Sequence, residues 1–191
     1  MQRGLILGGV ALALAACAPS DRVRTAEGGG ARPAPTFRIA LAGGGSFDMV
    51  QQRGRVVVLF FGYTHCPDVC PTTLSDFAGV RARLGKDAER VRFVFISVDP
   101  ARDTPEDAMR YARAFDSTFV GLSTDSASLA PIMRGFGVGA YREPGGDART
   151  YTVAHTASVF IVDPEGRQRE PVRFGPARAE ELRRAIEGAL E

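Results

Sequence analysis

The sequence predicts one α/β domain, in which a central mixed β-sheet is flanked by helices on both faces. Three observations support this fold class. Two largely apolar runs, Val56 to Phe61 and Val91 to Val98, are typical of central strands that are covered on both faces. A segment with helical periodicity follows each run. A strand–turn–strand pattern over residues 157–174, followed by another helix, completes the architecture.

The first residues predict export and a lipid anchor. Arg3 precedes an apolar stretch, Gly4 to Leu14, that is too short to span a bilayer as a mature helix. The following Leu-Ala-Ala-Cys ends at Cys17 and resembles the lipobox of bacterial lipoproteins, which implies cleavage before Cys17 and its acylation. An ordinary secretory peptide with an incidental cysteine is the alternative. We expect a signal peptide over residues 1–16 and a lipid-anchored protein that faces the periplasm in a bacterial cell envelope.

Composition divides the rest of the chain into a tether and a domain. Residues 17–35 are mainly Ala, Pro, Gly and charged residues, so we expect a flexible tether that buries little surface. Residues 36–191 are long enough to form one hydrophobic core. The formal net charge of +2 falls to +1 when Arg3 is removed with the signal peptide. This charge is too small to indicate a nucleic-acid partner.

The elements of the first half can be assigned in order. Apolar residues alternate over residues 37–41, and Gly43–Gly45 then turn the chain toward Phe47, which predicts an N-terminal β-hairpin. The strand Val56 to Phe61 leads into a helix that Gly85 can cap, with one apolar face formed by Leu74, Phe77, Ala78 and Leu84. After the second strand, Thr104 and Pro105 predict the cap and first position of another helix.

The second half is less regular. Residues 125–134 have helical spacing but contain Pro131, which predicts a short or kinked helix. Residues 135–146 are rich in glycine, and we expect a mobile loop there. The turn Asp163–Gly166 between two strands predicts a β-hairpin. An apolar stripe over residues 182–190 predicts the last helix.

The chemistry is expected at Cys66 and Cys70, directly after the first central strand. Two thiols near a helix N-terminus should ionise more readily than a free cysteine. Residues four apart in a helical first turn have Cβ atoms roughly 6 Å apart, which suits two sulfurs on one metal ion and still permits a disulfide if the backbone relaxes. A disulfide between them would close a very small loop and add little stability. We therefore expect a redox-active pair, a metal site, or both.

His155 is the candidate for a third ligand. It precedes the strand Ala157 to Val162, at the place where thioredoxin-type enzymes carry a proline that faces the active cysteines. Two thiolates and one imidazole form a three-coordinate soft site, which suits Cu(I), Zn(II) or, with rearrangement, Cu(II). His65 is next to Cys66 but is expected to point away from it, and we interpret it as a structural neighbour of the site.

These motifs resemble a known family. The order of elements resembles the thioredoxin fold, although the spacing here is Cys-x-x-x-Cys. The segments Phe61–Pro71 and Ser97–Pro105, together with His155 and Asp163–Gly166, resemble the Sco/SenC/PrrC family over about residues 36–190. The family often has Asp before the liganding histidine and Ser after it, whereas this chain has Ala154 and Thr156.

The resemblance implies a thioredoxin-like, membrane-tethered copper chaperone and not an enzyme. It implies that Cys66, Cys70 and His155 bind copper, and that the copper goes to the dinuclear copper centre in subunit II of cytochrome c oxidase. Periplasmic copper carriers and thiol reductants are further expected partners. The alternative is a thiol–disulfide reductase that prepares the cysteines of the oxidase subunit for metallation. A redox or copper sensor has less support, because no signalling module is visible in the sequence.

Overall fold

The computed structural model describes residues 1, 31–173, 175 and 177–191. The predicted signal peptide, Cys17 and most of the predicted tether lie outside the described residues. Within the part of the chain that is described, no helix combines the length and the apolar character needed to cross a membrane.

A seven-stranded mixed sheet forms the centre of the domain, in the order β1-β10-β9-β4-β5-β6, with β11 also paired to β9. Three strands are parallel: β4 (Val56–Gly62), β5 (Val91–Ser97) and β6 (Val120–Leu122). The strand β9 (Ser158–Val162) runs antiparallel to β4. The edge is completed by β1 (Arg32–Pro33), β10 (Arg167–Gln168) and β11 (Val172–Arg173).

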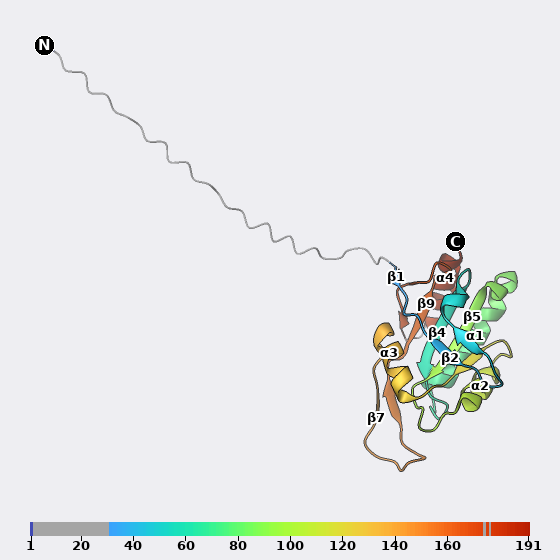
Figure 1. Cartoon of the computed structure of the whole chain (residues 1–191). Coiled ribbons are helices and arrows are strands. Elements are labelled where there is room, and N and C mark those ends of the chain that lie inside the picture. Colours follow the sequence, from blue (N-terminus) through green and yellow to red (C-terminus); the bar gives the residue numbers. More distant parts are fainter. Residues whose placement is uncertain (2–30, 174, 176) are drawn as a thin grey trace.

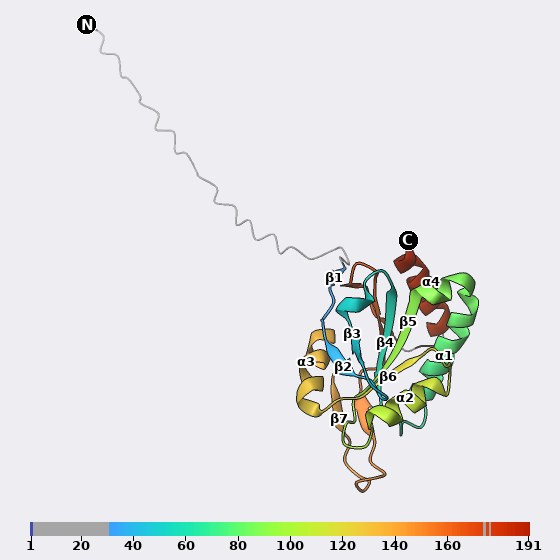
Figure 2. The same cartoon turned by 45° about the vertical axis from the view of Figure 1, so that its right-hand side comes forward.

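Helices cover both faces of this sheet (Figures 1 and 2). One face carries α1 (Val69–Arg83), α2 (Pro105–Arg113) and α4 (Arg178–Leu190). The other carries α3 (Ser126–Phe136) and the hairpin of β2 (Arg38–Ala40) and β3 (Ser46–Asp48). Short 3-10 helices lie at η1 (Val50–Gln52) and η2 (Gly85–Arg90). This is a thioredoxin-like fold, so the predicted fold class and N-terminal hairpin are confirmed.

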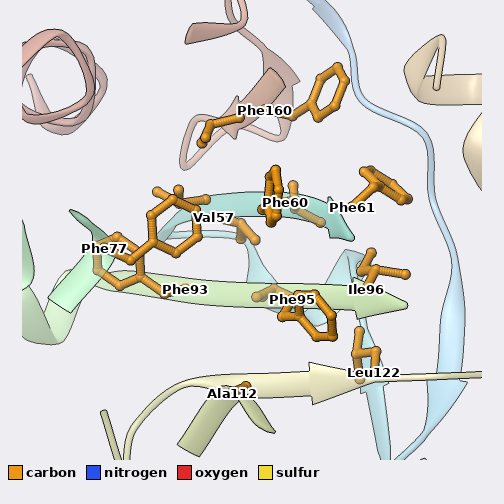
Figure 3. Packing of buried hydrophobic residues seen from close by; sticks show 14 of the residues in the cluster. Val57, Phe60, Phe61, Phe77, Phe93, Phe95, Ile96, Ala112, Leu122 and Phe160 are labelled. Atoms are coloured by element: carbon orange, nitrogen blue, oxygen red, sulfur yellow. The ribbon is translucent and has the colours of Figure 1, made fainter. Parts of the chain in front are cut away.

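The core is built on β4, all seven residues of which are buried. Because side chains alternate along a strand, the two faces of β4 and β5 receive different neighbours. Phe93 packs against Phe77 of α1, with ring centroids 5.2 Å apart. On the opposite face, Phe61 packs against Phe136 of α3 and Phe160 of β9. Figure 3 shows Phe61, Phe77, Phe93 and Phe160 around the two central strands.

The glycine-rich segment at the end of α3 is not simply a loop, so the expectation of a loop over residues 135–146 was wrong for residues 135–136 and 140–142. α3 extends to Phe136, and Gly137 ends it with a φ of 73°. The strand β7 (Ala140–Arg142) then pairs with β8 (Val153–His155). We call residues 140–155 the arm. It forms a two-stranded sheet separate from the central one and extends from one end of the domain (Figure 1).

One strand was missed, and the helix predicted around Pro131 is confirmed with its ends one or two residues from those expected. The strand β6 was missed, because three residues that include Gly121 carry little periodicity. The glycine is required there, since a Cβ would lie 1.9 Å from the carbonyl oxygen of Ala108 in α2. α3 continues through Pro131, helped by Asp125, whose side chain caps the first turn.

The ordered domain also begins earlier than residue 36. Arg32 and Pro33 pair with β10, and the Ala34 amide donates a hydrogen bond to the Gly166 carbonyl at 3.0 Å. Residues 32–35, predicted to belong to the tether, therefore contact the domain.

Candidate metal centre

Cys70 is held by the core. It is the second residue of α1 and is fully buried. Gly62, the last residue of β4, leaves room for its sulfur, because a Cβ at that position would lie 2.7 Å from Cys70 Sγ. An isolated glycine at the end of an otherwise apolar strand is a sequence signal for such a close approach.

Cys66 lies in the cysteine loop, which we define as residues 63–68 between β4 and α1. The expectation that both cysteines sit in a helical first turn was wrong, because α1 begins only at Val69. The Cys70 amide nevertheless points at Cys66 Sγ, 3.4 Å away. Cys66 is partly exposed, whereas Cys70 is buried, and both thiols are free.

His155 reaches the two sulfurs from the arm, where it is the last residue of β8. Its Nε2 lies 3.6 Å from Cys70 Sγ, and its Nδ1 lies 3.2 Å from the Thr156 carbonyl oxygen. The rings of Phe60 and Tyr63 flank the imidazole edge to face, each with its centroid 5.9 Å away. These contacts aim Nε2 at the sulfurs.

The three ligand atoms fit one soft cation. Cys66, Cys70 and His155 offer ligand atoms that all lie within 4.8 Å of one another. With metal–sulfur and metal–nitrogen bonds of about 2.3 and 2.0 Å, a trigonal site places sulfur and nitrogen about 3.7 Å apart. The observed 3.6 Å between Cys70 and His155 matches this geometry. The structure thus brings the predicted ligands together, while their role in binding a metal remains a prediction.

The two thiols differ in protonation, although the sequence alone predicts that both ionise readily. A hydrogen bond from Cys70, helped by one from His155, lowers the pKa of Cys66 to about 3 against the opposing effect of burial. The same Cys66–Cys70 hydrogen bond, together with burial, raises the pKa of Cys70. The pair therefore shares one proton, with the negative charge on the more exposed Cys66. The expectation that both thiols ionise readily holds for Cys66 and was wrong for Cys70.

Asp103 fixes the cysteine loop from the loop after β5. Its carboxylate accepts hydrogen bonds from the Thr64 amide (2.9 Å), the Thr64 hydroxyl (2.6 Å) and the Ser97 hydroxyl (2.6 Å). Asp103 is almost completely buried. His65 Nδ1 lies 3.5 Å from Asp103, and among the described residues His65 does not belong to the group of candidate ligands formed by Cys66, Cys70 and His155.

Comparison with known protein families shows which family the chain belongs to. The family model "SCO1/SenC" matches residues 25–191. The chain belongs to the SCO1/SenC family. Among solved structures of the family, Bradyrhizobium japonicum ScoI with copper bound is 37% identical to this SCO1/SenC chain, with a TM-score of 0.73. That match covers 83% of this chain and 99% of ScoI.

Other family members extend the comparison. The mitochondrial SCO2 homolog of Bos taurus is 31% identical over 175 residues, which is 85% of this chain but only 63% of the bovine protein. BsSco, described as a member of the Sco family of cytochrome c oxidase assembly proteins with a disulfide switch, shares the fold at 17% identity and a TM-score of 0.64. That match covers 84% of this chain and 94% of BsSco.

Proposed function

We propose that this SCO1/SenC protein is a copper chaperone that binds one copper ion through Cys66, Cys70 and His155. We propose further that it delivers the ion to the dinuclear copper centre of cytochrome c oxidase subunit II. The observation that carries the proposal is the convergence of two sulfurs and one imidazole nitrogen within 4.8 Å. The copper-bound structure of ScoI supports the choice of metal, and the description of BsSco supports the link to oxidase assembly.

The site suits a copper ion that is bound and then transferred to another protein. Three soft ligands satisfy Cu(I), whereas a structural zinc site normally has four protein ligands. Cys66 and His155 are only partly buried, so a ligand of an acceptor can approach the ion from solvent. Stepwise replacement of these two ligands, with the buried Cys70 last, transfers the ion without releasing it to water.

Membrane attachment is a separate part of the proposal. Cleavage before Cys17 and acylation of that residue would anchor the protein in the bacterial cell envelope, with the domain facing the periplasm. Several acyl chains on one residue anchor a protein far more firmly than a single chain. Mass spectrometry of membrane fractions tests this proposal, since Cys17→Ser should abolish the lipid adduct and release the protein from the membrane.

A thiol–disulfide reductase is the second candidate, and the uneven protonation of the two thiols favours it. A half-exposed thiolate at Cys66 is the form that attacks a disulfide. Cys66 would form a mixed disulfide with the acceptor. Cys70 would then attack the sulfur of Cys66 and release the acceptor thiol. The acceptor gains two electrons from the dithiol, one proton from Cys70 and one proton from solvent, and this chain ends as the Cys66–Cys70 disulfide. A thiol reductant must then reduce this disulfide to regenerate the dithiol.

An anaerobic copper titration of the reduced full chain tests the main proposal. We expect one Cu(I) per chain and a large loss of affinity in Cys66→Ala, Cys70→Ala and His155→Ala. If His155→Ala binds Cu(I) as the wild type does, His155 is not a ligand. If the wild type binds none, the chaperone proposal fails.

Transfer assays separate the two candidates. A chaperone passes copper to the reduced acceptor domain and requires His155. A reductase reduces the disulfide of the acceptor domain in the absence of copper, and His155→Ala retains this reaction. Measuring both reactions with the same acceptor shows which role the protein performs.

A further inference from the structure

Arg102 lies between the two halves of the candidate copper site. It belongs to the loop of residues 98–103 that follows β5, and only 9% of its side chain is exposed. Its neighbour Asp103 holds the cysteine loop through Thr64. Arg102 itself faces the arm that carries His155. One short loop therefore contacts both elements that supply ligands.

The guanidinium of Arg102 makes three kinds of contact at once. Its Nε donates to Asp99 Oδ2 at 2.5 Å, which fixes the side chain in the loop. Its Nη1 donates to the carbonyl oxygens of Tyr151 (2.9 Å) and Arg149 (3.2 Å) at the base of the arm. Its Cζ atom lies over the Tyr151 ring, 3.5 Å from the ring centroid. A lysine cannot reproduce this set, because it lacks a planar fork of donors.

Tyr151 completes the connection. Its hydroxyl donates to the other oxygen of Asp99 at 2.5 Å, so Asp99, Arg102 and Tyr151 form a closed cluster. Tyr151 is 8% exposed, whereas residues 141–150 of the arm are all exposed. The cluster thus marks the point where the arm joins the domain, four residues before His155. Tyr63 adds a further contact, because its ring packs against the His155 imidazole with the two centroids 5.9 Å apart.

We propose that Arg102 is a positioning residue for His155, acting through Tyr151 to place the imidazole within bonding distance of the ion held by Cys66 and Cys70. The inference rests on the proposed copper site. The two cysteines are fixed independently, by the core and by Asp103. Loss of Arg102 should therefore displace one ligand and leave the other two in place.

The first test needs no copper. In the NMR spectrum of the reduced apo protein, the His155 imidazole should show nuclear Overhauser effects to the rings of Phe60 and Tyr63. We expect Arg102→Gln and Arg102→Lys to weaken or abolish them. Arg110→Gln is the matched control, because Arg110 is exposed on α2 and pairs with Asp107. It should retain the wild-type pattern.

The second test uses copper. We expect Arg102→Gln to lower copper affinity by about 10- to 100-fold, the usual cost of losing a residue that orients a metal-ligating histidine. Its Cu(II) absorption and electron paramagnetic resonance spectra should shift toward those of His155→Gly. Free imidazole should restore the wild-type spectrum in both variants.

The outcomes are separable. A folded Arg102→Lys or Arg102→Gln with wild-type contacts at His155, wild-type spectra and wild-type affinity overturns the positioning role. If Arg102→Gln does not fold, Arg102→Lys and Tyr151→Phe give the decision by the same measurements. A wild type that binds no copper defeats the proposed function, whereas the NMR contacts still decide whether Arg102 positions His155.

Discussion

Cys70 and His155 approach the same point from two very different supports. Cys70 is fully buried at the start of α1, against a glycine of the central strand β4. His155 ends the β7–β8 arm, which lies outside the central sheet and is largely exposed. The dithiol is therefore part of the folded core, and the imidazole is added by an appendage. Under the proposed chaperone function, this difference makes His155 the ligand that should exchange first.

Removal of each ligand in turn should give the largest contrast. Cys70→Ser should lower copper affinity by more than the roughly 100-fold that losing an outer partner costs, because a core-held thiolate is lost. It should also destabilise the fold by about 1–3 kcal/mol, since a hydroxyl replaces a buried sulfur. His155→Ala should lower copper affinity with little change in stability. Copper competition and urea unfolding measure both effects, and equal destabilisation by the two variants would contradict the comparison.

The next-largest effect should come from crowding the core around Cys70. Gly62→Ala places a Cβ 2.7 Å from Cys70 Sγ and 2.9 Å from the Phe60 ring, and we expect a loss of about 1–3 kcal/mol in the free energy of unfolding. Gly79→Ala is the matched control, because nothing lies within 4 Å of its Cβ on the surface of α1. It should stabilise by about 0.5–1 kcal/mol. If Gly62→Ala leaves the free energy of unfolding in urea unchanged, the core does not fix the sulfur of Cys70.

The cysteine side of the site should make the stability of the protein depend on pH. Because the folded pKa of Cys66 is about 3, below its unfolded value, the unfolded state binds more protons between these values. The stabilising contribution is therefore present at high pH and is lost as the pH falls through the folded pKa. Relative to Cys66→Ser, the reduced wild type should gain stability from pH 5 to pH 8. Alkylation of Cys66 should also stay efficient at pH 5. A steep loss of alkylation below pH 8 would show an ordinary thiol.

The smallest effect is expected on the exposed part of the arm. Tyr141 is 66% exposed, and Tyr141→Ser should change stability by no more than about 0.5 kcal/mol and leave copper affinity unchanged. Tyr151→Phe is the buried counterpart and removes a hydroxyl bonded to Asp99. It should cost about 1–3 kcal/mol in urea unfolding. Equal costs for the two tyrosines would mean that the arm is anchored elsewhere.

Much of the fold could be predicted because several elements carry strong local patterns. The apolar runs of β4 and β5 are long enough to be recognised, and the prediction of a helix after Thr104 is confirmed by a complete capping box with Asp107. β6, β7 and β8 are only three residues long and lack such patterns. Their pairing depends on neighbours that are distant in the sequence, so local periodicity cannot reveal them.

The candidate site, like the fold, could be predicted only in part from the sequence. The sequence by itself determined the candidate donor set, because two thiols and one histidine at these positions already favour a soft cation. Only the tertiary structure decided that Cys66 and Cys70 differ, with the proton retained by the buried thiol. It also decided that Arg102 and Tyr151 join the arm to the domain. Burial and hydrogen bonding depend on residues that are far apart along the chain, so the fold must form before they can act.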